Sequence, residues 1–225
     1  MLDPEFWSRL LGIIVIDLTL AGDNALVIAL AVRNLPPRQQ FWGRIFGTAG
    51  AVILRLAFIT VTTYLLTVPY LQLIGGVLLI WIAIRLVRPG GHGEHTRQGT
   101  SVWEAMWIIV VADAVMSLDN VLAVAGASGG DLVLVVIGIG LSLPLVVWGS
   151  GILARLMDRF PWIIWLGGGV LGYVAGEMIV SDHAVVRWVE PAGPAVELVS
   201  WVLAAVLTAL GWWLARRARA EPRAT

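Results

Sequence analysis

The stretch VIDLTLAGDNALVIALA, residues 15–31, is apolar enough to cross a bilayer, yet it carries two aspartates and an asparagine near its middle. A carboxylate at membrane depth costs ~2.5 kcal/mol or more, so acids in such positions usually serve a function. The stretch VVADAVMSLDNVLAVAGA, residues 110–127, repeats the pattern 96 positions later. The matched pairs are Asp17 with Asp113, Asp23 with Asp119, and Asn24 with Asn120. This duplicated motif decides the expected fold and function.

The composition predicts an all-α polytopic membrane protein. Of the 225 residues, 59% are hydrophobic and only 13% are charged, whereas soluble domains have roughly 45–50% apolar and about 25% charged residues. The chain has no cysteine, which excludes disulfides and thiolate metal sites. All fifteen basic residues are arginines, so a retinal protein, which needs a lysine Schiff base, is excluded as well.

Apolar runs predict a single transmembrane domain over residues 1–225 with seven transmembrane helices. Twelve of the fifteen arginines then fall on one side of the membrane, which by the positive-inside rule is the cytoplasmic side. The N-terminus is therefore expected outside, with the C-terminus and the loop 88–102 in the cytoplasm. The predicted spans are 6–32, 43–66, 69–87, 103–127, 131–154, 162–181 and 196–215.

The two motifs lie in the first and fourth spans, so they cross the membrane in opposite directions. This is the pattern of an inverted repeat, with residues 6–87 as the first three-helix unit, 103–181 as the second and 196–215 as a seventh helix. Alternating-access transporters often have this plan, with the substrate site at the midplane between the repeats.

The motif spacing gathers oxygen ligands on one face of each helix. Seven residues turn through about 700°, so the first acid and the amide of each motif share a face. Two such helices meeting at the centre would bring together up to four carboxylates and two amides, a ligand set suited to a hard divalent cation such as Mn²⁺, Mg²⁺ or Ca²⁺. Thr19 and Ser117 could add hydroxyls, although helical counting does not place them cleanly on this face. The predicted metal ligands are Asp17, Asp23, Asn24, Asp113, Asp119 and Asn120. Without a metal ion, neighbouring carboxylates favour protonation, which suggests exchange of metal for protons.

Other polar residues have weaker interpretations. Arg55, inside the second span, could pair with a site carboxylate or act as a structural counter-ion, and the second interpretation is slightly favoured. Glu177 is interpreted as a wetted helix end rather than an accessory ligand. The His92, Glu94 and His95 group is interpreted as part of a flexible, glycine-rich linker rather than a metal-capture patch.

With these motifs, the chain resembles the TerC family of integral membrane proteins, and most closely its YjbE-like branch. The resemblance is carried by residues 17–28 and 113–122 and supported by Gly47-Thr-Ala-Gly-Ala, Leu73-Ile-Gly-Gly and Pro144-Leu-Val-Val-Trp-Gly-Ser. It implies a divalent-metal transporter that exports manganese, with the family's motif acids at the four aspartates. One departure is Leu118, which stands where the first repeat has Gly22.

Three alternatives stay open from the sequence. A cation channel is compatible with an inverted repeat. An intramembrane aspartyl protease needs two membrane aspartates, but the Gly-x-Gly-Asp context of such enzymes is replaced here by Leu20-Ala-Gly-Asp. A seven-span receptor has no use for a duplicated acidic motif. We therefore expect no enzyme activity, no permanently bound cofactor and no nucleic-acid partner. We expect a multi-pass protein of the bacterial cytoplasmic membrane whose partners are lipid and a divalent metal ion, and the sequence leaves open whether it forms a homo-oligomer.

Overall fold

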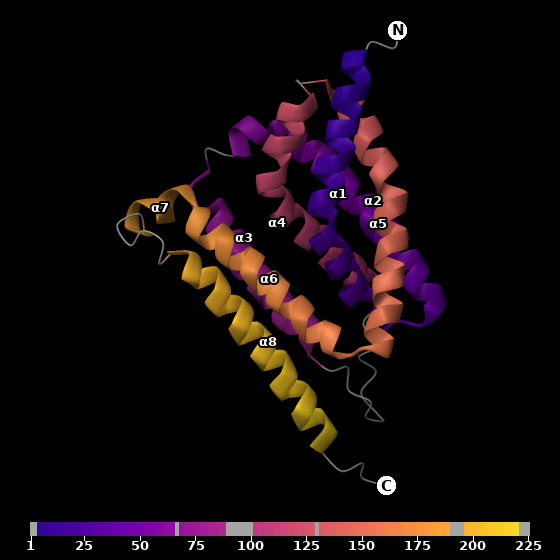
Figure 1. Ribbon diagram of the computed structural model, residues 1–225, viewed down its shortest axis with the longest axis vertical. Coiled ribbons are helices and arrows are strands. Elements are labelled where there is room, and N and C mark those ends of the chain that lie inside the picture. Colours follow the sequence, from indigo (N-terminus) through magenta and orange to yellow (C-terminus); the bar gives the residue numbers. More distant parts are fainter. Residues whose placement is uncertain (1–3, 66–67, 89–100, 129–130, 190–195, 221–225) are drawn as a thin grey trace.

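Every regular element in the described part of the chain is helical. The computed structural model describes residues 4–65, 68–88, 101–128, 131–189 and 196–220. Within the helices, side chains are not described at 4–5, 18–21, 62–65, 118–123, 125–127, 183, 188–189 and 219–220. The helices are α1 (Pro4–Val32), α2 (Pro37–Leu65), α3 (Leu71–Val87), α4 (Val102–Ser128), α5 (Leu132–Arg159), α6 (Trp162–Ser181), α7 (His183–Val189) and α8 (Glu197–Ala220) (Figure 1).

The all-α prediction is confirmed, and a helix lies at each of the seven predicted ranges. The short helix α7 was not predicted. Helix α2 begins at Pro37, because proline is well suited to the first turn of a helix. The predicted span began only at residue 43, because the first residues of the helix are mostly polar and a search for apolar runs misses them. Helix α8 continues to Ala220 rather than 215. In its last turns the guanidinium groups of Arg216 and Arg217 lie 4.0 and 3.7 Å from the ring centres of Trp212 and Trp213.

Four helical segments of the described chain are long and apolar enough to cross a membrane: Pro37–Val61, Leu132–Arg159, Trp162–Ser181 and Glu197–Ala218. Helix α1 makes a fifth if its two parts count as one bent span. Its segments Phe6–Asp17 and Gly22–Val32 differ in direction by 46°, so the bend falls within the first acidic motif. The chain is therefore a membrane protein with four to five candidate spans, and the total of seven stays a prediction.

The helices form two groups that meet along α1, α3, α4 and α6 (Figure 1). In the first group, α1 packs on α5 and on α4, and α2 packs on α4. In the second group, α6 lies between α3 and α8, and α8 follows α6 along most of its length. Both acidic motifs belong to the first group, because one lies in α1 and the other in α4.

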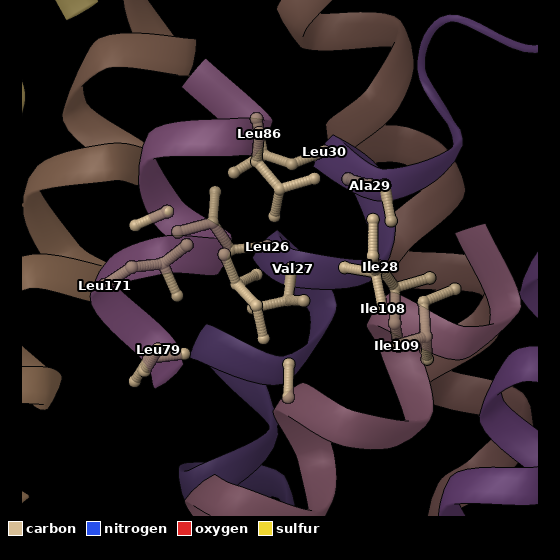
Figure 2. Close-up of a cluster of buried hydrophobic side chains, with 14 of the residues drawn as sticks. Leu26, Val27, Ile28, Ala29, Leu30, Leu79, Leu86, Ile108, Ile109 and Leu171 are labelled. Atoms are coloured by element: carbon tan, nitrogen blue, oxygen red, sulfur yellow. The ribbon is translucent and has the colours of Figure 1, made fainter. Parts of the chain in front are cut away.

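The C-terminal half of α1 forms the centre of the main apolar core. All residues from Leu26 to Val32 are buried, so this part of the helix is enclosed on every side. Figure 2 shows its side chains beside Leu79 and Leu86 of α3, Ile109 of α4 and Leu171 of α6. The core therefore fixes the position of the C-terminal half of α1, which directly follows the motif residues of the same helix.

Glycines allow the helices to approach closely, as small residues do at membrane helix interfaces. A methyl group on Gly176 of α6 would lie 2.5 Å from the Ser200 Cα of α8. In the first group, a methyl on Gly47 of α2 would lie 2.7 Å from Ile109 Cδ1 of α4. A methyl on Gly138 of α5 would lie 2.5 Å from Ile13 Cγ2 of α1.

Candidate functional site

The two motif helices place one buried aspartate each on either side of an arginine. Arg55 of α2 donates from Nη1 to Asp17 Oδ1 of α1 at 2.5 Å, and from Nη2 to Asp113 Oδ1 of α4. The exposed fractions are 2% for Asp17, 9% for Asp113 and 6% for Arg55, so this charged triad is withdrawn from solvent. Buried charges of this kind are tolerated only when they are paired and hydrogen-bonded.

Two serines complete the hydrogen bonding of the carboxylates. Ser117, one turn after Asp113, accepts from Arg55 Nε at 3.0 Å and donates to Asp113 Oδ2 at 3.2 Å. Ser142 of α5 donates to Asp17 Oδ2, and its Oγ also lies 2.9 Å from the Ile139 carbonyl oxygen. All four carboxylate oxygens therefore have a partner, and two acids with one guanidinium leave the triad with a net charge of −1 when both acids are ionised.

A small cavity of about 20 Å³ lies against this triad, between α1, α2, α4 and α5. Such a volume holds about one water-sized particle. Two buried oxygens among the lining residues have no hydrogen-bond partner in the described structure: Asn24 Oδ1 and Thr48 Oγ1. Both side chains are 5% exposed. Unpaired buried acceptors of this kind are costly unless a water or an ion meets them.

The predicted ligand set is assembled in part. Asp17, Asn24 and Asp113 all line the cavity, as the helical counting required for Asp17 and Asn24. Asp23 is half-buried and accepts a hydrogen bond from the Asn24 backbone N–H at 2.9 Å; it is not among the cavity-lining residues. The side chains of Asp119 and Asn120 lie outside the described residues. Among the side chains that are described, no three of the types His, Cys, Asp and Glu gather closely enough to hold a metal ion.

The structure describes some, but not all, of the other polar residues that the sequence singled out. Arg55 contacts both motif acids, as the first of its two interpretations predicted, and a structural counter-ion role stays a prediction. Ser117 joins the network, although helical counting had not placed it there. Thr19 and the group His92, Glu94 and His95 lie outside the described side chains. Glu177 is exposed on α6, and its interpretation as a wetted helix end stays a prediction.

Two site residues had no signal in the motif. Ser142 and Thr48 are isolated polar residues in α5 and α2, the two helices of the first group that have no acidic motif. The sequence signal that could have drawn attention to them is a lone hydroxyl within a long apolar run, and Thr48 also lies in the Gly47–Ala51 stretch that supports the resemblance.

Comparisons with known proteins identify the family. The family described as "Integral membrane protein TerC family" matches residues 2–220. The chain belongs to the TerC family. It is 44% identical over 181 residues to the uncharacterized membrane protein YjbE of Bacillus subtilis, a match covering 80% of this chain and 83% of that protein.

Two further relatives are less similar to this chain. The UPF0053 inner membrane protein YoaE of Escherichia coli K12 is 26% identical over 184 residues, 73% of this chain, which corresponds to 35% of that longer protein. The uncharacterized membrane protein YkoY of Bacillus subtilis is 24% identical over 243 residues, covering 93% of this chain and 72% of that protein. No solved structure matches this TerC family chain significantly.

Proposed function

We propose that this TerC family protein is a divalent metal-ion transporter that exports manganese from the cytoplasm across the bacterial cytoplasmic membrane. The ion binds at the membrane midplane between the two acidic motifs and exchanges with protons. The protein carries out no chemical catalysis, holds no permanent cofactor and binds no nucleic acid.

The observation that carries this proposal is the convergence of Asp17 and Asp113 on Arg55 beside a small cavity. Each acid comes from a different copy of the motif, and the two meet at the packed centre of the first helix group. Asn24 and Thr48 add two unpaired oxygens to the same cavity. Carboxylate, amide and hydroxyl oxygens are ligands that hard divalent cations prefer.

The packing supports an inverted repeat of α1–α3 and α4–α6, with α8 as the seventh span. Ile13 and its motif counterpart Ile109, 96 positions later, each pack against a glycine of a neighbouring helix, Gly138 and Gly47. These glycines are 91 positions apart. The same 91-residue shift relates three of the four α2 residues of the cavity lining to its three α5 residues: Ala51 with Ser142, Val52 with Leu143, and Arg55 with Val146. This correspondence around the cavity supports the proposal that the two repeats meet there.

Seven spans with the N-terminus outside account for the arginine distribution. They place Arg33, Arg38, Arg88 and Arg155 on one side, together with the Arg-rich end of α8. In this orientation the two halves can rock about the central site and open it to each side in turn.

Manganese flux in sealed proteoliposomes tests the proposal. The purified protein should move Mn²⁺, and a pH gradient should drive the movement. Asp17→Asn and Asp113→Asn should each slow the flux at least about tenfold, because each removes one charged ligand worth ~1.5–3 kcal/mol. Asp131→Asn is a matched control: Asp131 is exposed, and its side chain caps α5, a role that asparagine also fills. Folded wild-type protein that moves no divalent ion under any gradient would refute the proposal.

The alternative functions make different predictions in the same vesicles. A channel would give flux that does not saturate with Mn²⁺ and no counter-transport. A protease dyad shares a proton between two adjacent carboxylates, whereas here Arg55 lies between them and pairs with both. The described geometry therefore favours ion binding over peptide hydrolysis.

A further inference from the structure

Arg55 occupies the place where a cation would neutralise the two motif acids. Its guanidinium does not form a two-pronged pair with one carboxylate, which is the common arrangement. It uses one Nη for Asp17 on α1 and the other for Asp113 on α4, so it joins the two motif helices. Among the described side chains, no other basic residue contacts these acids.

Every carboxylate oxygen of the two acids already accepts a hydrogen bond. Each acid gives one oxygen to Arg55 and the other to a serine, Ser142 for Asp17 and Ser117 for Asp113. A divalent cation that takes an oxygen from each acid must therefore compete with Arg55 or with a serine at each of them, and its charge also repels the guanidinium that lies between the two acids. The neighbouring cavity, with its unpaired Asn24 and Thr48 oxygens, is the position from which an incoming ion could do so.

The positive charge comes from one half of the molecule only. Under the 91-residue shift that relates the cavity residues of α2 and α5, the counterpart of Arg55 is Val146, which also lines the cavity. One guanidinium therefore serves two acids and leaves a charge of −1. The site stays attractive to a cation while the repulsion between Asp17 and Asp113 is relieved.

We propose that Arg55 is a tethered cation, which pairs with Asp17 and Asp113 while no metal ion is bound and is displaced when a divalent cation binds. This inference rests on the proposed transport function and adds a residue that sets its affinity. Two buried, unpaired carboxylates would be expensive in an apolar interior, so Arg55 stabilises the ion-free carrier. By competing for the same oxygens it also weakens metal binding, which allows the ion to be released.

The displaced guanidinium keeps an acceptor besides the motif acids. Ser117 Oγ already accepts from Arg55 Nε. Asp23 of α1, outside the cavity lining, is close enough to interact electrostatically with Arg55. Arg55 can therefore leave one motif acid without losing all of its polar partners.

Titration of Mn²⁺ alone into the full-length protein in lipid nanodiscs, followed by calorimetry, tests this inference. The wild type is compared with Arg55→Gln, Arg55→Lys and the control Arg187→Gln, which removes an exposed charge on α7. Arg55→Gln should bind Mn²⁺ at least about tenfold more tightly, corresponding to ~1.4 kcal/mol, and should release it more slowly in vesicles. The Mn²⁺ affinity of Arg55→Lys should lie between that of the wild type and that of Arg55→Gln, because one ammonium group cannot hold both acids in the forked geometry of a guanidinium. Arg187→Gln should match the wild type.

Equal or weaker Mn²⁺ binding by folded Arg55→Gln would overturn the inference, because Arg55 would then only order the acids. If Arg55→Gln does not fold, Arg55→Lys decides: tighter binding than wild type supports competition, and unchanged or weaker binding refutes it. A wild type that binds and moves Mn²⁺ while the Arg55 variants bind no more tightly refutes the tethered cation alone. A wild type that neither binds nor moves any divalent ion refutes the transport function and the inference with it.

Discussion

Replacement of Ser142 by alanine measures how strongly the hydroxyl of α5 stabilises the Asp17 carboxylate. Ser142 and Ser150 are both buried serines of α5, and each has its Oγ 2.9 Å from the carbonyl oxygen three residues earlier. Only Ser142 also reaches a carboxylate. Ser150→Ala therefore provides a control for the loss of a buried hydroxyl in the same helix.

The expected magnitude follows from the charge and burial of Asp17. Hydrogen bonds to charged groups contribute ~1.5–3 kcal/mol, and an unsatisfied buried acceptor costs a similar amount. With an exposed fraction of 2%, Asp17 has little access to bulk water that could replace the serine. We therefore expect Ser142→Ala to lower the free energy of unfolding by ~1.5–3 kcal/mol more than Ser150→Ala does.

Equilibrium unfolding in mixed detergent micelles, followed by circular dichroism, measures this difference. Combining Ser142→Ala with Asp17→Asn completes a double-mutant cycle, and the coupling free energy should be at least about 1 kcal/mol, because the charge that strengthens the bond is gone. Equal destabilisation by the two serine variants, within about 0.5 kcal/mol, would refute the reasoning. It would mean that the Asp17 oxygen finds another partner at no cost, such as a water in the adjacent cavity.

Two further substitutions test the packing and the cavity. Gly176→Ala places a methyl against the backbone of α8 at Ser200, so it should cost ~1–3 kcal/mol and lower the midpoint of thermal unfolding. Gly149→Ala, at a position with open space, should leave the midpoint nearly unchanged, and equal midpoints for the two variants would contradict the close approach. Thr48→Val removes an unpaired buried oxygen, so the free energy of unfolding should rise by up to ~1 kcal/mol. Calorimetry should show that the Mn²⁺ affinity of the same variant falls at least about fivefold, or ~1 kcal/mol. A loss of both stability and affinity would mean that Thr48 has a structural partner.

The motif predicted the parts of the site that depend on a single helix. Asp17 and Asn24 share a face of α1 because they are seven residues apart, and the repeat identified Asp113 as the counterpart of Asp17. The first relation follows from helical periodicity, and the second follows from the sequence repeat. The helices themselves were predictable because apolar runs of this length have few alternatives.

The parts of the site that depend on how helices meet could not be predicted. Whether Arg55 reaches one acid, both or neither depends on the rotation and depth of α2 against α4, which the close contact at Gly47 fixes. Ser142 reaches Asp17 because α5 packs on α1 at Gly138. A single sequence gives the periodicity of each helix but not the register between two of them.

The order in which the ribosome makes these partners has a consequence for membrane insertion. Asp17 is made first, Arg55 follows 38 residues later, and Ser142 follows 125 residues later. At ~5–20 residues per second, Ser142 is synthesised ~6–25 s after Asp17. An isolated helix with an aspartate at the bilayer centre carries a penalty of ~2.5–3.5 kcal/mol during this interval.

If its two bent parts form one span, helix α1 differs from a fully apolar span, which can leave the insertion machinery by itself. Its acid gains a counter-charge only when α2 enters, and its remaining oxygen gains a partner only when α5 enters. We expect α1 to stay beside the insertion machinery or at the membrane surface until α2 arrives. The polar centre of this protein is thus completed during biogenesis only after five helices have been made.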